Sequence, residues 1–395
     1  MQLRVTDCGC GGALVNQASI AQWAVGNLRE RMRVEGIGAC IVADPVNVTY
    51  LSGHVIGGLV GLANTTAYVL LTDEDAVLVA PASAGFQPPD WLRLLTYEDY
   101  AIAHTVNVPA AALEAFEKAL FVVTGAGKVA AELGQLPAAA YQSLNACRGV
   151  ESVVDVRSIL RALRAVKSPH EVEAIRRSVR ACDRIFATIA EVIGEGSTEL
   201  DVYVACVEVV AQEAGGPAIL DGDFVSGERT EEIGGKPTAR ALRRGDLLIL
   251  DVYPRLGAYW ADVTRTYVVG ESTPAQVQRH ALLEEALAAG ERAIRPGLPT
   301  KELYHVVKGV FDRAGLGERF PHHAGHCVGL TPSEDPRIIP GSNAILQEGM
   351  VITLEPGLYV PGEGGMRLED NYVVTKAGFE SLSEYPKKLI SLGEQ

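Results

Sequence analysis

The sequence predicts an α+β protein in which a larger unit, residues 163–395, follows a smaller α/β unit, residues 1–162. Three observations support this prediction. A length of 395 residues is typical of two domains. Helical and strand-like patterns alternate through the first unit, as they do in α/β cores. In the second unit, long helical patterns accompany strands joined by short turns, which favours a mainly antiparallel sheet.

The expected elements of the first unit follow from its hydrophobic pattern. Apolar residues recur at helical spacing over residues 19–34. Residues 39–43 are an apolar run typical of a buried strand, which Asp44 and Pro45 would end. Further strand-like runs occur at 67–71, 76–80, 129–132 and 153–154, the first two forming a predicted hairpin. Nothing in this unit indicates catalysis by itself.

The second unit begins at a strong helix start. Ser168-Pro-His-Glu171 is a capping box with proline at the first helical position. Thr198-Glu-Leu-Asp201 and Thr273-Pro-Ala-Gln276 are capping boxes of two further helices, and a fourth helix follows Pro299. The strand-like runs of this unit are 247–253, 262–269, 350–355 and 366–375.

Composition and charge exclude several classes of protein. A hydrophobic content of 48% with 21% charged residues excludes wholesale disorder. A net charge of −14 argues against a nucleic-acid or anionic-membrane partner, and no apolar run has the length of a membrane span. The amino terminus lacks a signal-peptide pattern, and seven scattered cysteines suit a reducing compartment, so we expect a cytoplasmic protein. Cys8 and Cys10 are expected to be ordinary thiols.

Two aspartates in the second unit are the first indication of chemistry. Residues 247–253 and 262–269 are strand-like and are joined through Pro254 and Gly257, so a hairpin would bring Asp251 and Asp262 together. Two carboxylates held near buried strands repel each other and are costly to desolvate, so they need a cation. The alternative is that Asp251 begins the turn and Asp262 is a solvated edge residue.

Three more ligand-type side chains follow the same logic. His326 lies in a glycine-containing segment, 321–330, where the backbone can approach a ligand closely. Glu355 and Glu369 lie on strand-like runs joined by the turn 361–365. Four carboxylates and one imidazole are what two adjacent divalent ions require, with one position left for water.

The order and local motifs of these residues resemble the five-ligand set of the pita-bread metallopeptidases. This family includes Xaa-Pro dipeptidase, aminopeptidase P, methionine aminopeptidase and the related creatinase, and the first two are nearest to this chain. Residues 44–53 and 167–171 also resemble the amino-terminal signature and the domain junction of the prolidase/creatinase branch. The motifs are Asp251, Asp262-Val-Thr-Arg-Thr, Gly-His326-x-x-Gly, Thr-Leu-Glu355-Pro-Gly and Arg-Leu-Glu369-Asp.

The resemblance implies a pita-bread catalytic domain behind a creatinase-like domain, and a role for each ligand. Asp262 and Glu369 would bridge two metal ions, Asp251 would complete the shell of one ion, and His326 and Glu355 that of the other. A water between the ions would attack a polarised carbonyl. Glu355 would also move protons, so His326 and Glu355 are the catalytic candidates. Oxygen-rich ligation favours Mn²⁺, with Co²⁺, Fe²⁺ or Zn²⁺ as alternatives.

Three neighbours of the ligands are candidates for supporting roles. Thr264 and Thr266 would face the metal side of their strand, and Arg367 would lie on the face of Glu369 as a support or a substrate contact. The alternative for all three is plain sheet packing or surface pairing.

The sequence departs from the family at two positions near the scissile bond. The peptidases have a histidine seven residues after the metal histidine, where this chain has Ser333, and another before the first ligand strand, where it has Gly234. Loss of one such electrostatic contact typically costs roughly 10²–10³ in rate. Residues 226–230 and Lys236 are expected either to substitute for these contacts or to form a solvated loop.

Other histidines are candidates for binding a substrate. His322 and His323 flank the metal histidine, and one of them would contact substrate or serve only a structural hydrogen bond. In creatinase-like dimers the amino-terminal domain of one subunit reaches the partner's active site, so His54 would be a contact across a homodimer.

Three functions remain open at this stage. The first is a dinuclear-metal hydrolase that cleaves the C–N bond of a small peptide, like Xaa-Pro dipeptidase or aminopeptidase P. The second keeps the metals but acts on a small amidine, cyclic amide or modified amino acid, as creatinase and ectoine hydrolase do. The third is a metal-binding homologue without turnover.

Overall fold

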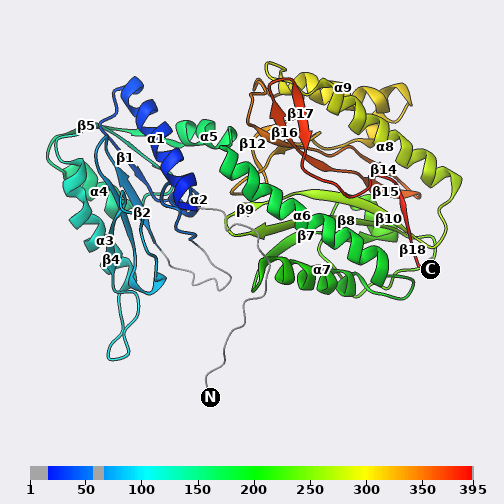
Figure 1. Cartoon of the computed structure of the whole chain (residues 1–395), viewed down its shortest axis with the longest axis horizontal. Helices are drawn as coiled ribbons and strands as arrows, with labels where there is room; N and C mark the ends of the chain where they lie inside the picture. The colour runs from blue at the N-terminus through cyan, green and yellow to red at the C-terminus, as the bar shows by residue number, and fades with distance from the viewer. Residues whose placement is uncertain (1–16, 57–65, 394–395) are drawn as a thin grey trace.

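The computed structural model describes residues 17–56 and 66–393, which form two lobes (Figure 1). The amino-terminal lobe contains one sheet, and the carboxy-terminal lobe contains the remaining sheets with long helices outside them. This confirms the predicted order of an α/β unit before an α+β unit. The predicted boundary between residues 162 and 163 falls inside helix α5 (Arg157–Ala165) and stays a prediction. Cys8 and Cys10 lie outside the described residues.

The amino-terminal lobe is built on a six-stranded mixed sheet in the order β4-β3-β2-β1-β5-β6. Strands β1, β2 and β3 form an antiparallel meander, and the other neighbours pair in parallel. The strands are β1 (Ala39–Val42), β2 (Tyr68–Leu71), β3 (Ala76–Pro81), β4 (Arg93–Tyr97), β5 (Gly127–Ala131) and β6 (Val150–Asp155). The helices are α1 (Gln17–Glu35), α2 (Pro45–Ser52), α3 (Val108–Ala119) and α4 (Ala138–Ala146).

The two faces of this sheet face different cores. Because side chains alternate along a strand, Ile41 packs with Phe116 of α3, whereas Cys40 packs with Leu28 of α1. The cluster on the α1 side continues without interruption to Phe186 of α6 (Pro169–Val192) and Leu250 of β8 (Leu247–Leu256). The two lobes therefore share one hydrophobic core.

The predicted helix at 19–34 and the hairpin at 67–80 are confirmed. Asp44 ends the first strand as expected, but it does so by beginning a helix that the sequence analysis did not predict. Its carboxylate accepts a hydrogen bond from the Val46 backbone N–H at 2.8 Å and caps α2.

The carboxy-terminal lobe contains two five-stranded sheets and a separate ribbon. The first sheet has the order β18-β10-β8-β7 with β9 on β8, and the second has the order β12-β11-β13-β16-β17. The first is made of β7 (Ile219–Ser226), β8 (Leu247–Leu256), β9 (Tyr259–Trp260), β10 (Val263–Val269) and β18 (Ile390–Leu392). The second is made of β11 (His326–Cys327), β12 (Glu334–Arg337), β13 (Val351–Leu354), β16 (Asp370–Thr375) and β17 (Gly378–Ser381). The ribbon is β14 (Gly357–Val360) with β15 (Gly364–Arg367).

Four long helices cover the outer faces of these sheets (Figure 1). Helices α6 and α7 (Glu199–Ala214) pack on the first sheet, and α8 (Pro274–Ala293) and α9 (Thr300–Arg313) pack on the second. The capping boxes predicted at Ser168, Thr198 and Thr273 are all present. The inner faces of the two sheets therefore face each other.

One predicted strand is wrong in a way that matters for the site. Residues 366–375 form two strands, β15 and β16, which belong to different sheets. Between them the Leu368 N–H donates to the Pro356 carbonyl, and the Glu369 N–H donates to the Thr264 carbonyl. These bonds divert the chain from one sheet to the other. Glu369 lies in this break, and Asp262 and Glu355 likewise lie just outside strands.

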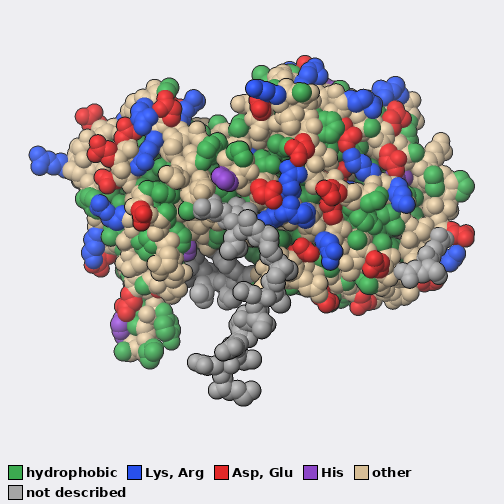
Figure 2. Space-filling view, viewed as in Figure 1, with side chains coloured by type: hydrophobic (Ala, Val, Ile, Leu, Met, Phe, Trp, Pro, Cys, Tyr) green, Lys and Arg blue, Asp and Glu red, His purple; other side chains and the backbone are tan. Residues whose placement is uncertain are grey.

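Acidic and basic side chains are interspersed on the face shown in Figure 2, apart from the residues drawn in grey. Among the helices in the described ranges, none combines the length and apolar character needed to cross a bilayer.

Candidate metal centre

The five predicted ligands converge between the two inner sheets. Asp251 comes from β8, Asp262 precedes β10, His326 is in β11, Glu355 follows β13 and Glu369 lies between β15 and β16. The Nε2 atom of His326 is 3.4 Å from Asp262 Oδ2 and 3.4 Å from Glu355 Oε1. Single ligand atoms of Asp262, His326 and Glu369 all lie within 4.8 Å of one another. All five side chains are buried.

The hairpin β8–β10 brings the two aspartates together, as expected. The strands are antiparallel, with Asp251 opposite Thr264. The alternative, a turn residue and a solvated edge residue, is wrong because Asp251 is 3% exposed and Asp262 is 5% exposed. Local sequence therefore builds half of the cluster without help from the rest of the chain.

The carboxylates have oxygen atoms that the protein does not satisfy. Asp251 Oδ1, Asp262 Oδ1 and Glu369 Oε1 are buried and have no hydrogen-bond partner. Buried polar atoms are normally paired, so such a group of orphaned oxygens requires a ligand. His326 Nδ1 lies 2.9 Å from the Cys327 carbonyl oxygen and donates to it, which leaves Nε2 as a lone-pair donor towards the carboxylates. These residues fit a pair of divalent cations.

Without cations the cluster holds protons instead. Burial raises the pKa of Glu355 to about 7. Burial and the charge of Asp251 raise the pKa of Asp262 well above its ordinary value, and burial and the charge of Asp262 do the same to the pKa of Glu369. Cations would remove this cost by neutralising the same oxygens.

We therefore expect metal-free protein to lose stability as the pH rises from about 4.5 to about 7. Folded Glu355 keeps its proton up to about pH 7, whereas an unfolded glutamate releases it near 4.5. The folded state binds more protons in this window, so its free energy of unfolding falls by roughly 1.4 kcal/mol per pH unit for this group. Melting temperatures of chelator-treated protein at pH 5, 6 and 7 measure the trend.

Saturating Mn²⁺ is the control for this experiment. Cation binding requires ionised carboxylates, so added metal should weaken or reverse the fall in melting temperature. A melting temperature of metal-free protein that rises between pH 5 and pH 7 would contradict the expected proton uptake.

The predicted supporting residues divide into two groups. The Thr264 hydroxyl donates to Glu369 Oε2 at 2.8 Å and accepts from Arg367 Nε at 3.2 Å, so it orients a ligand. Thr266 does not bond a ligand: its hydroxyl bonds the backbone of Arg367 at 2.9 and 3.0 Å. Arg367, expected on the face of Glu369, is linked to it through the Thr264 hydroxyl, and its guanidinium also contacts Asp251, with Nη2 2.5 Å from Oδ2.

Asp223, Tyr253 and Tyr359 belong to this network but were not among the predicted site residues. The Tyr253 hydroxyl donates to Asp251 Oδ2 at 2.7 Å. Asp223 lies directly opposite Asp251 in the β7–β8 pair, and its Oδ2 is 3.1 Å from Arg367 Nη2. The Tyr359 hydroxyl accepts from Arg367 Nη1 at 2.9 Å. The available signal was the strand-like pattern of residues 219–226 before the ligand hairpin, since a neighbouring strand in register would place Asp223 on the same face as Asp251.

The candidate substrate histidines lie at different distances from this network. His323 Nδ1 is 3.3 Å from Glu355 Oε1, and His322 Nε2 is 3.1 Å from the Tyr359 hydroxyl. Burial lowers the pKa of His322 to about 3 and that of His323 to about 4, so both rings are neutral near pH 7. His54 packs against Phe86 in the amino-terminal lobe and is not brought to the cluster within this chain.

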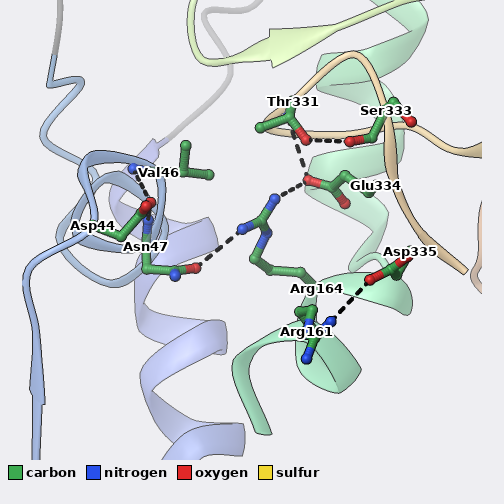
Figure 3. A pocket seen from close by; sticks show the side chains of 9 residues that line it. All are labelled: Asp44, Val46, Asn47, Arg161, Arg164, Thr331, Ser333, Glu334 and Asp335. Carbon is green, nitrogen blue, oxygen red and sulfur yellow. Dashed lines mark hydrogen bonds and ion pairs between the residues drawn. The ribbon is translucent and has the colours of Figure 1, made fainter. Parts of the chain in front are cut away.

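The two positions that depart from the family have specific surroundings. A Cβ atom built on Gly234 would lie 2.1 Å from Asp223 Oδ2, so no side chain fits there while Asp223 keeps its place. Ser333 lines a cavity of about 270 Å³ between the lobes, which Asp44 and Arg164 also line (Figure 3). The Ser333 carbonyl accepts from the Thr331 hydroxyl at 2.9 Å.

Two side chains of the segment 226–230 are bonded to a buried carboxylate, whereas Glu228 and also Lys236 are largely exposed. The Ser226 hydroxyl donates to Glu199 Oε1 at 2.8 Å, and Arg229 forms an ion pair with the same buried carboxylate. Lys236 pairs with Asp221 on the surface and donates to the Gly222 carbonyl at 3.2 Å. These side chains hold the loop together.

Comparison with known protein families assigns both lobes. The profile described as Metallopeptidase family M24 matches residues 173–376, and the profile described as Creatinase/Prolidase N-terminal domain matches residues 25–166. The two matches follow one another in the order that the resemblance implied, and they confirm the pita-bread assignment.

Individual relatives agree with this assignment. A Xaa-Pro dipeptidase of Pyrococcus horikoshii is 29% identical over 363 residues, which cover 91% of this chain and 97% of that protein. A probable dipeptidase PepE of Mycobacterium tuberculosis is 34% identical over 270 residues, or 68% and 72% of the two chains. The crystal structure of a prolidase from Pyrococcus horikoshii superposes with a TM-score of 0.78 at 28% identity and covers 93% of this chain and all of that one.

Proposed function

We propose that this chain, which belongs to metallopeptidase family M24, hydrolyses the C–N bond of small peptides of the Xaa-Pro type in a metal-dependent reaction. The observation that supports this most is the cluster of five buried ligands with three orphaned carboxylate oxygens. A protein that had lost its metals would gain stability by losing these carboxylates, because unpaired buried charges are costly. Their retention argues against a homologue without turnover.

The chain's own residues would divide the work as follows. Asp251, Asp262, His326, Glu355 and Glu369 would hold two divalent cations, which supply a polarised carbonyl and a water that ionises near neutral pH. Glu355 would accept the proton of the attacking water and return it to the leaving nitrogen. Its pKa near 7 in the metal-free protein shows how strongly burial favours its protonated form, and Thr353, whose hydroxyl donates to Oε1 at 3.3 Å, orients it.

The neutral rings of His322 and His323 are suited to hydrogen bonding rather than to charge pairing. His322 contacts Tyr359, and His323 contacts the ligand Glu355, so both rings lie beside the cluster. Both rings would contact the substrate, either directly or through the side chain that each already contacts. His54 would reach a substrate only from the partner subunit of a homodimer, the assembly that we also propose.

A second substrate class is favoured by one observation. Gly234 and Ser333 replace histidines that the peptidases place around the scissile bond, and Asp223 occupies the space beside Gly234. The alternative is therefore a hydrolase of a small amidine, cyclic amide or modified amino acid. Oxygen-rich ligation favours Mn²⁺ in both cases, ahead of Co²⁺, Fe²⁺ or Zn²⁺, and the cysteine usage favours a cytoplasmic enzyme.

Metal analysis combined with a peptide assay tests the proposal. We expect two divalent ions per chain in protein supplemented with Mn²⁺, and cleavage of at least one dipeptide in a panel of Xaa-Pro substrates. Two bound ions without cleavage of any Xaa-Pro dipeptide would exclude the peptidase proposal and leave the second class. Absence of bound metal under these conditions would exclude both.

A further inference from the structure

The carboxylate of Asp223 lies beside Gly234, at the position where the resemblance places a histidine in the peptidases. Its Oδ1 accepts a hydrogen bond from the Gly235 N–H at 2.9 Å. Its Oδ2 lies 2.1 Å from the position that a Cβ on Gly234 would take. Any side chain at position 234 would therefore displace the Asp223 carboxylate.

The loop around Gly234 is built in a strained conformation that fits this arrangement. Ile233 has a φ of 71° and a ψ of −51°, and the Gly234 N–H bonds the Glu232 carbonyl at 2.8 Å. This is a classic γ-turn, which is rare and strained for a β-branched residue. The turn aims the Ile233 carbonyl at Arg367 Nη1, 2.8 Å away. Strain of this kind persists where the surroundings hold it in place, here Asp223 and Arg367.

Asp223 is more exposed than the carboxylates that would bind metal. Its side chain is 25% exposed, whereas those of Asp251 and Arg367 are each 4% exposed. Arg367 is shared between the two aspartates and lies closer to Asp251, at 2.5 Å against 3.1 Å. The Tyr253 hydroxyl is likewise closer to Asp251, at 2.7 Å against 3.5 Å, so the outer carboxylate is the less compensated of the two.

The charges beside Asp223 favour a cation there. Asp251 lies opposite it on β8, and the guanidinium of Arg367 is shared between the two carboxylates. A cationic group of a ligand would offset the repulsion between them.

We propose that Asp223 binds a cationic nitrogen of the substrate, next to the metal centre, and so determines specificity at the position where related peptidases use a histidine. The class of ligand is an ammonium, guanidinium or amidinium group that donates hydrogen bonds to the carboxylate. The same carboxylate repels a substrate carboxylate placed there. This inference rests on the proposed function, because it assigns the substrate class of the same site.

Binding of matched charged and neutral ligands to the Mn²⁺-loaded protein tests the inference by calorimetry. The first pair is the ketomethylene analogue of Ala-Pro, which lacks a scissile C–N bond, and the same compound without its amino group. The second pair is 4-guanidinobutanamide and its neutral isostere 4-ureidobutanamide. Wild-type protein should prefer the cationic member of at least one pair by roughly 10- to 100-fold. The first pair reports a peptide ammonium and the second a guanidinium.

Asp223→Asn keeps the size and hydrogen-bond acceptor of the side chain but removes its charge. We expect this variant to bind both members of the responsive pair within roughly threefold of each other and to retain two metal ions per chain. Gly234→Ala should lose the preference in the same way, because its Cβ displaces the carboxylate. Asp221→Asn is the matched control: it removes a charge two residues away on the same strand, paired with Lys236, and should keep the wild-type preference.

Three results would overturn the inference: no preference for the cation in either pair with wild-type protein, a preference unchanged in Asp223→Asn, or a preference lost equally in Asp221→Asn. A role of Asp223 in positioning Arg367 alone would lower the affinity for both members of a pair and leave their ratio unchanged. Failure of the proposed hydrolysis is separate from these outcomes. It would appear as absent metal or absent cleavage, while the ratio of dissociation constants remains measurable.

Discussion

Asp262→Asn should reduce kcat/KM by at least roughly 10³-fold and, in the same protein, raise the melting temperature of the metal-free form. The side chain is buried between His326 and the other carboxylates, and its Oδ1 has no partner in the protein. Removing its charge removes a ligand that both cations would share, so catalysis fails. In metal-free protein the same change removes a source of repulsion, and the pKa of Glu369 should fall towards its ordinary value.

A loss of activity together with a higher melting temperature of the metal-free form distinguishes a metal ligand from a residue that merely supports the fold. Saturating metal stabilises a folded protein by about 2.7 kcal/mol at one hundred times its dissociation constant, and this increment should be largely lost in the variant. Differential scanning calorimetry with chelator and with Mn²⁺ measures both effects. A variant that is destabilised without metal, or that keeps the metal-induced increment, would show that Asp262 does not hold the cations.

The metal ligands could be predicted because each lies in a short segment with its own local pattern. The two aspartates belong to one hairpin, and a hairpin fixes the pairing of its strands within a few residues. His326, Glu355 and Glu369 were placed by their motifs rather than by contact, since no local rule says that β11, β13 and β16 meet β8 and β10. The helices were predicted from their capping boxes for the same reason: the signal lies within four residues.

The remaining parts of the site depend on pairings that the sequence does not display. Residues 366–375 read as one strand, and only hydrogen bonds to Pro356 and Thr264 divide them between two sheets. Arg367, at the end of β15, therefore bonds Asp251 directly and reaches Glu369 only through the Thr264 hydroxyl. Asp223 was missed because its importance comes from the register of β7 against β8. At Gly234 the sequence shows only that the histidine of the family is missing. The structure adds that the Asp223 carboxylate lies where a side chain at this position would begin.

A buried charge cluster also lies at the junction between the lobes. Glu334 Oε1 accepts from Arg164 Nη2 at 2.5 Å, and its Oε2 accepts from Lys167 Nζ at 3.0 Å. Arg164 also donates a hydrogen bond from Nη1 to Asn47 Oδ1 of the amino-terminal lobe, at 3.2 Å (Figure 3). Glu334 Oε1 also accepts from the backbone N–H of Leu330 at 3.0 Å, so it fixes the loop that carries Ser333.

Glu334→Ala should lower the free energy of unfolding by about 3–5 kcal/mol, because it leaves the buried Lys167 and the largely buried Arg164 without their carboxylate. Burial raises the pKa of Glu334, but Lys167 and Arg164 outweigh it and lower the pKa to about 2. The stabilisation is therefore fully present above about pH 4.5 and is lost as the pH falls towards 2. Urea unfolding at pH 7 of wild-type and variant protein, both with chelator, measures the difference.

Asp335→Asn is the matched control, one residue further along the same strand. Its ion pair with Arg161, at 3.2 Å, lies in solvent, with side-chain exposures of 55% and 63%, and such pairs contribute about 0–1 kcal/mol. Equal losses in the two variants would show that burial does not decide the strength of this junction. A large loss in Glu334→Ala alone, accompanied by a weaker affinity for substrate analogues, would connect the junction to the active site. The loop that Glu334 holds contains Ser333, the position where this chain lacks the histidine of its family.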